Sequence, residues 1–115
     1  MIKAVITRDT TGAINHFTLS GHADAGEYGQ DIVCSAVSAV SIGAVNGIEA
    51  LAGFTPDVEA DEVNGGHLAL AVNRGSLTGE QQHITQILLE NLLLSLQSIE
   101  EQYGAYLTVS TANQH

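Results

Sequence analysis

The chain has very few cationic side chains. Its 115 residues include only three Lys and Arg, which are Lys3, Arg8 and Arg74, against 13 Asp and Glu, so the formal net charge at pH 7 is −10. Neutralising a nucleic-acid backbone or an anionic membrane surface takes several cations on one face of a protein. The composition therefore argues against nucleic acid and membrane as partners, and it favours a basic partner or substrate.

Cysteine is also scarce. The one cysteine, Cys34, has no partner for an internal disulfide, which favours a reducing compartment, and residues 1–8 lack the pattern of a signal peptide. The uncharged stretch 32–48 contains too many Ala, Ser and Gly residues for a typical membrane span, so it is interpreted as a buried helix. We therefore expect a cytoplasmic protein.

Charged residues make up only 14% of the chain, against about 25% in an average soluble domain. A surface with so few charged side chains favours coverage by a partner or by a second copy of the chain.

The length predicts one domain over residues 1–115. Short apolar runs with β-branched residues predict strands at 2–7, 14–20, 56–63, 67–73 and 105–109, whereas the polar segment 110–115 is expected to fray.

Two helices are predicted from apolar residues at three- and four-residue spacing. The first begins at Ile32, with Asp31 as its N-cap, and ends near Gly53, while the glycine-rich segment 21–31 before it is expected to be a mobile loop. The second follows a capping box at Thr78 and ends near Gly104, and its wide apolar surface favours a subunit contact. The order ββαββαβ predicts an α+β two-layer sandwich, a mixed β-sheet with both helices on one face.

The densest group of reactive side chains is His22, Asp31 and Cys34. The expected start of the helix puts Cys34 in its first turn, where unpaired amides and the helix dipole stabilise a thiolate, and a nearby imidazolium stabilises it further. His22 would accept the thiol proton and later donate it to a leaving amine, while backbone amides near Cys34 would hold the oxyanion. Asp31 caps the helix, orients His22 or does both, and we favour the cap.

Residue chemistry alone leaves simpler interpretations open. A lone cysteine among small helical residues is more often a buried hydrophobe, and a lone histidine beside a glycine turn is more often a surface residue. A zinc site drawn from His16, His22, Asp24, Asp31 and Cys34 lacks the second cysteine that zinc deaminases use. The acidic segment 57–62 is most simply a solvated face, with docking of a basic protein as the alternative.

The chain carries Gly-His-Ala at residues 21–23 and Gly-Gln-Asp-Ile-Val-Cys-Ser-Ala-Val-Ser at residues 29–38. Together these motifs resemble the ribosomal-processing cysteine protease family, called Prp. The resemblance implies a homodimeric cysteine endopeptidase of the bacterial cytoplasm that removes an N-terminal extension from a large-subunit ribosomal protein. It implies Cys34 as nucleophile, His22 as base and Asp31 as supporting residue, with no cofactor and no metal. The alternative function is that of a binding protein: a non-enzymatic acidic dimer that binds or escorts a basic ribosomal protein.

Overall fold

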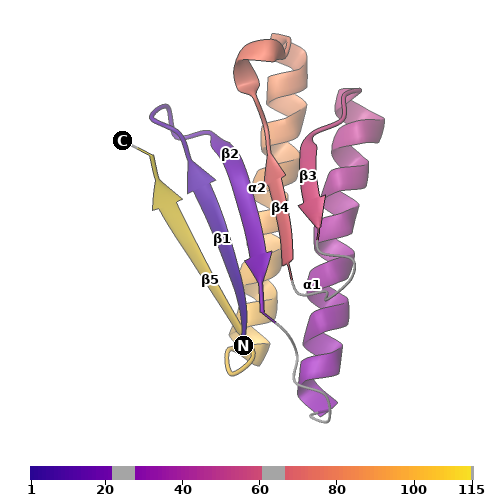
Figure 1. The fold of residues 1–115 in the computed structure, drawn as a ribbon, viewed down its shortest axis with the longest axis vertical. Helices are drawn as coiled ribbons and strands as arrows, with labels where there is room; N and C mark the ends of the chain where they lie inside the picture. The colour runs from indigo at the N-terminus through magenta and orange to yellow at the C-terminus, as the bar shows by residue number, and fades with distance from the viewer. Residues whose placement is uncertain (22–27, 61–66, 115) are drawn as a thin grey trace.

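The computed structural model describes residues 1–21, 28–60 and 67–114. Both helices lie on one face of a five-stranded sheet (Figure 1). The strands are β1 (Ile2–Arg8), β2 (Ile14–Ser20), β3 (Asp57–Ala60), β4 (His67–Ala71) and β5 (Leu107–Asn113). The helices are α1 (Tyr28–Gly47) and α2 (Gly79–Tyr103), with a π-helical turn at Ile48–Ala52 and a 3₁₀ turn at Arg74–Ser76. The predicted α+β sandwich and its element order are confirmed.

The sheet has the strand order β3-β4-β2-β1-β5 and is mixed, because β1 and β5 run parallel while the other neighbours run antiparallel. The predicted pairing of β3 with β4 is confirmed, although the turn expected at 64–66 lies outside the described residues. The expectation that 110–115 frays is wrong for residues 110–113. They continue β5 along β1 to the pair Arg8↔Asn113, since backbone hydrogen bonds hold a strand whatever the polarity of its side chains.

The core lies between the sheet and the two helices. Alternate residues of β1 face the helices, and α1 and α2 each bury one apolar stripe against them. The most deeply buried side chains include Ile6, Ile14, Phe17, Val33, Ile48, Leu70, Leu89, Leu92, Leu96 and Leu107. The opposite face of the sheet, toward the viewer in Figure 1, is covered by neither helix.

The first helix begins earlier than its apolar pattern predicts. It starts at Tyr28, so Asp31 lies inside the first helical turn and the prediction that it is the N-cap is wrong. The expected loop 21–31 is likewise helical over residues 28–31, while residues 22–27 lie outside the described part of the chain. The polar residues Gln30 and Asp31 and the poor helix former Gly29 gave no periodic signal. The π-helical turn extends the helical stretch beyond α1, and this stretch ends as predicted at Gly53, whose positive φ of 77° closes the last turn.

Within the described residues, Ile32–Ala52 is the one helical stretch long and apolar enough to cross a membrane by length and composition. A core helix meets the same criteria, and α1 packs on α2 within the sandwich. Only 28% of the stretch is buried, so the interpretation of a buried helix holds for one face alone. Ile42, for example, is exposed.

The second helix is fixed at both ends and to the sheet. The capping box is confirmed: the Thr78 amide donates to Gln81 Oε1 at 3.0 Å, and the Gln81 amide donates to Thr78 Oγ1 at 3.1 Å. Gln86 accepts from the amide of Ile14 and donates to its carbonyl, both at 2.7 Å. This amide clamp holds α2 against the start of β2, and the helix ends before Gly104 as predicted.

Candidate active site

Gly21 determines how the chain leaves β2. Its φ is +101°, and a β-carbon there would stand 2.1 Å from the carbonyl oxygen of Met1. Only glycine satisfies both the backbone angle and this close approach. The predicted base, His22, is the next residue and lies outside the described residues.

Cys34 has a free, half-buried thiol that packs against the hydrophobic core. The sequence predicted Cys34 in the first turn of the helix. Because α1 begins at Tyr28, Cys34 lies in the second turn instead. A regular helix pairs its amide with the carbonyl four residues earlier, and the unpaired amides belong to the first turn. The Cys34 amide thus falls in the paired part of the helix, while the assignment of the oxyanion to backbone amides near Cys34 stays a prediction. The helix dipole also weakens beyond the first turn, so stabilisation of a thiolate depends chiefly on a nearby imidazole.

The side of α1 that carries Cys34 follows from the packing of the two helices. A β-carbon at Gly47 would lie 3.4 Å from Leu88, so Gly47 marks the side of α1 that faces α2. Thirteen residues separate Cys34 from Gly47, which at 100° per residue turns Cys34 about 140° away from that side. Cys34 therefore lies on the flank of α1 away from α2. Figure 1 shows that this flank lies beyond the β3 edge of the sheet.

Of the predicted site residues, Cys34 is the one whose side chain the structure describes. The backbone of Asp31 is in the first turn of α1, three residues before Cys34, while its side chain lies outside the described part. The roles of His22, Asp31 and Cys34 stay predictions.

The zinc alternative gains no support where the structure describes side chains. Within those residues, no group of three or more His, Cys, Asp and Glu side chains is placed to hold a metal. His16 lies on β2 beside Phe17, whose side chain is buried toward the helices, and so His16 faces the opposite side of the sheet from α1. The sheet thus separates His16 from Cys34, while Asp24 lies outside the described residues.

Residues 1–108 match the model of a protein family described as cysteine protease Prp. The chain belongs to the Prp family. It is 43% identical over 104 residues to the ribosomal processing cysteine protease Prp of Staphylococcus aureus, a match that covers 90% of this chain and 92% of that one. It is 40% identical over 111 residues to the Prp of Bacillus subtilis, covering 96% of this chain and 97% of that one.

Solved structures of Prp proteins share this fold. A crystal structure of an essential ribosomal processing protease Prp from S. aureus, in complex with a covalently linked product peptide, superposes with a TM-score of 0.80 at 38% identity. The match covers 96% of this chain and 99% of that one. The resemblance in the motifs at 21–23 and 29–38 is therefore confirmed at the level of the family, and the chain is a cysteine protease.

Proposed function

We propose that this Prp protein is an endopeptidase that removes the N-terminal extension of a large-subunit ribosomal protein during ribosome maturation, with Cys34 as its nucleophile. One observation carries the assignment of the nucleophile: the chain has a single cysteine, and it lies within the residues that match the family. A cysteine protease attacks with a thiolate. The names of the relatives from S. aureus and B. subtilis support the ribosomal substrate.

In the proposed mechanism, His22 takes the proton from Cys34, and the thiolate sulfur attacks the carbonyl carbon of the scissile peptide bond. When the tetrahedral intermediate collapses, the carbon–nitrogen bond breaks and the imidazolium gives its proton to the leaving amine. A water molecule, deprotonated by His22, then hydrolyses the thioester and releases the thiol. Asp31 supports this pair by orienting the imidazole. No cofactor or metal takes part.

The charge of the chain supports a basic protein substrate. Arg8 is held by Glu90, and Arg74 is held by Asp9 at 2.8 Å, so two of the three cations are already neutralised. The remaining surface is dominated by carboxylates, and a field of one sign speeds the encounter with a partner of the opposite charge. Ribosomal proteins are typically basic, so this field favours such a substrate.

The same proposal includes a homodimer in the bacterial cytoplasm. The helical segments leave four large apolar side chains more than half exposed, at 56% for Ile42, 64% for Leu51, 56% for Ile87 and 62% for Leu94. A second copy of the chain would cover such a surface symmetrically. A free cysteine and a ribosomal substrate are both typical of the cytoplasm.

Mass spectrometry of the substrate tests the proposed cleavage. The purified protein is incubated with the candidate ribosomal protein carrying its extension, and the mass of the intact product is measured. We expect wild type to produce a shortened N-terminus and Cys34→Ser, folded to the same circular dichroism spectrum, to produce none. An intact substrate that binds wild type and Cys34→Ala equally well would contradict proteolysis and would identify the acidic escort instead.

A further inference from the structure

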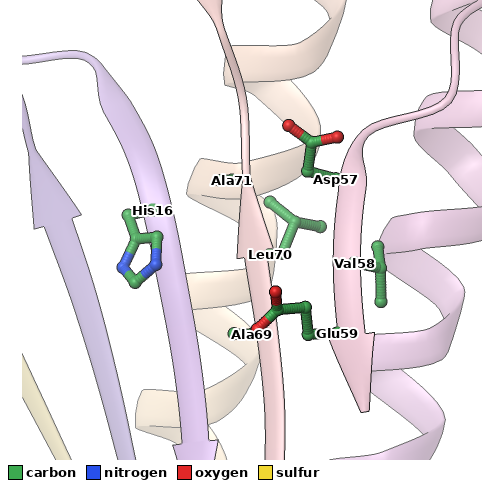
Figure 2. Close-up of a pocket in the computed structure, with 7 residues that line it drawn as sticks. All are labelled: His16, Asp57, Val58, Glu59, Ala69, Leu70 and Ala71. Carbon is green, nitrogen blue, oxygen red and sulfur yellow. The ribbon is translucent and has the colours of Figure 1, made fainter.

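The uncovered face of the sheet contains a hollow on its β3 side (Figure 2). Its volume is about 480 Å³, and it is lined by His16, Asp57, Val58, Glu59, Ala69, Leu70 and Ala71. Volumes of this size are typical of ligand-binding pockets. The hollow exists because β4 presents only the small side chains of Ala69 and Ala71 on this face, between larger residues of β2 and β3.

The β3 side of the hollow is formed by two carboxylates. Asp57 lies opposite Ala71 and Glu59 lies opposite Ala69, so both side chains are on the uncovered face, about 7 Å apart along the strand. Neither forms an ion pair with any residue that the structure describes, because Arg8 and Arg74 are engaged elsewhere. Lys3 lies opposite Ser20, toward the other end of β2 from His16. Two neighbouring carboxylates without a cation favour a cationic ligand.

Within the described residues, no strand pairs with the outer edge of β3. β3 is the last strand of the sheet on this side, and all four of its residues are exposed. Edge strands present unpaired N–H and C=O groups to which an extended segment adds by β-augmentation. A side chain of such a segment on the uncovered face would stand about 5 Å from Asp57 or Glu59. A Lys or Arg at that position is long enough to reach the hollow.

The free edge of β3 and Cys34 lie on the same side of the molecule. The flank of α1 that carries Cys34 faces away from α2, and β3 is the edge strand on that side. Figure 1 shows β3 running opposite to α1, toward the end of the molecule where α1 begins. A segment laid along β3 therefore leads toward the turn of α1 that holds Cys34.

We propose that β3 and the hollow bind an extended cationic segment of the protein substrate, which adds to the outer edge of β3 and places a Lys or Arg side chain between Asp57 and Glu59. The inference rests on the proposed function in assigning this segment to the substrate. The surface recognises residues remote from the scissile bond. It therefore contributes to substrate binding and leaves the chemical step unchanged.

The first test compares two double variants that remove the same charge. Asp57→Asn with Glu59→Gln alters the hollow, and Glu80→Gln with Glu101→Gln alters two exposed carboxylates of α2. The substrates are a peptide that copies the extension and cleavage site and carries Lys at alternate positions, and the same peptide with norleucine in place of Lys. We expect the hollow variant to raise KM for the Lys peptide roughly three- to tenfold without changing kcat, and to leave the norleucine peptide unaffected. Equal effects of both double variants, or equal effects on both peptides, would overturn the inference.

A binding measurement separates this inference from the proposed cleavage. Fluorescence anisotropy with the labelled Lys peptide is measured on the Cys34→Ala background, so the result does not depend on turnover. A Kd raised by the hollow variant alone supports the inference even if wild type cleaves nothing, whereas an unchanged Kd overturns it even if cleavage is normal. Peptides N-methylated at alternate amides test the strand addition. Two such peptides are compared, one methylated at the odd-numbered amides and one at the even-numbered amides. Weaker binding of one of the two peptides supports strand addition, and equal affinity of both overturns it.

Discussion

Gly21 and the carbonyl group of Met1 approach so closely that a β-carbon on residue 21 would stand 2.1 Å from the carbonyl oxygen. This contact joins the end of β2 to the start of β1, immediately before the predicted catalytic residue His22. The glycine thus fixes the direction of the chain where it enters the Gly-His-Ala motif. A larger residue must move the backbone there, because the contacting atom belongs to the main chain.

Gly21→Ala is expected to lower both activity and stability, and Gly12→Ala is its matched control. Gly12 also has a positive φ, of 90°, but no atom lies within 4 Å of an added β-carbon. Both variants bear the strain of a positive φ, about 1 kcal/mol, and only Gly21→Ala also displaces the backbone. We expect Gly12→Ala to retain the wild-type kcat/KM and Gly21→Ala to lose at least about tenfold, since misplacing a catalytic group by 1 Å has effects of this size. Equal kcat/KM in the two variants would show that Gly21 does not position the site.

Asp9 is expected to make folding stability depend on acid pH. The Thr11 hydroxyl donates to its carboxylate at 2.6 Å and Arg74 donates at 2.8 Å, and these bonds lower the pKa of Asp9 from 3.8 to about 2. Because the folded state holds the ionised form, the contribution of Asp9 is complete above pH 4 and is lost as the pH falls toward 2. Denaturant unfolding at several pH values should show the stability gap between wild type and Asp9→Asn closing over that range. A gap that stays constant from pH 5 to about pH 2 would refute this linkage.

The exposed apolar surface of the helices is expected to hold the dimer together. A charge at Leu94 would be buried without a partner in the interface, so Leu94→Glu should dissociate the dimer, as should Ile42→Glu. Thr111→Glu adds the same charge at an exposed position of β5, outside both helices of the chain, and should leave the dimer intact. Sedimentation velocity at micromolar concentration distinguishes the two states. A wild-type monomer, or dissociation by Thr111→Glu alone, would refute this interface.

Local sequence patterns predicted those parts of the fold that depend on nearby residues. The capping box of Thr78 and Gln81 and the glycine that ends the first helix are interactions within one turn, so their residue types were sufficient. The start of α1 was placed four residues late because its first turn offers no apolar periodicity. Residues 110–113 were expected to fray because their strand is defined by pairing with β1, about a hundred residues earlier in the chain.

The candidate site shows the same division between local and distant contacts. The sequence blocks at residues 21–23 and 29–38 are local motifs, and together they led to the family that the comparisons confirm. The acidic segment 57–62 was considered as a docking surface for a basic protein only as an alternative to a solvated face. The hollow beside it has no sequence signal, because three strands from separate parts of the chain form it. Only the register that places Ala69 and Ala71 between β2 and β3 reveals the space in front of Asp57 and Glu59. The closeness of Gly21 to Met1 likewise has no signal in either residue.

Activation of Cys34 by His22 is measured most directly by the rate at which iodoacetamide alkylates the protein at pH 7. The chain has one thiol, so every adduct reports on Cys34. We expect wild type and the control His83→Ala, which changes an exposed histidine of α2, to react at the same rate, and His22→Ala to react at least about tenfold more slowly. Equal alkylation rates for wild type and His22→Ala would contradict the catalytic pair.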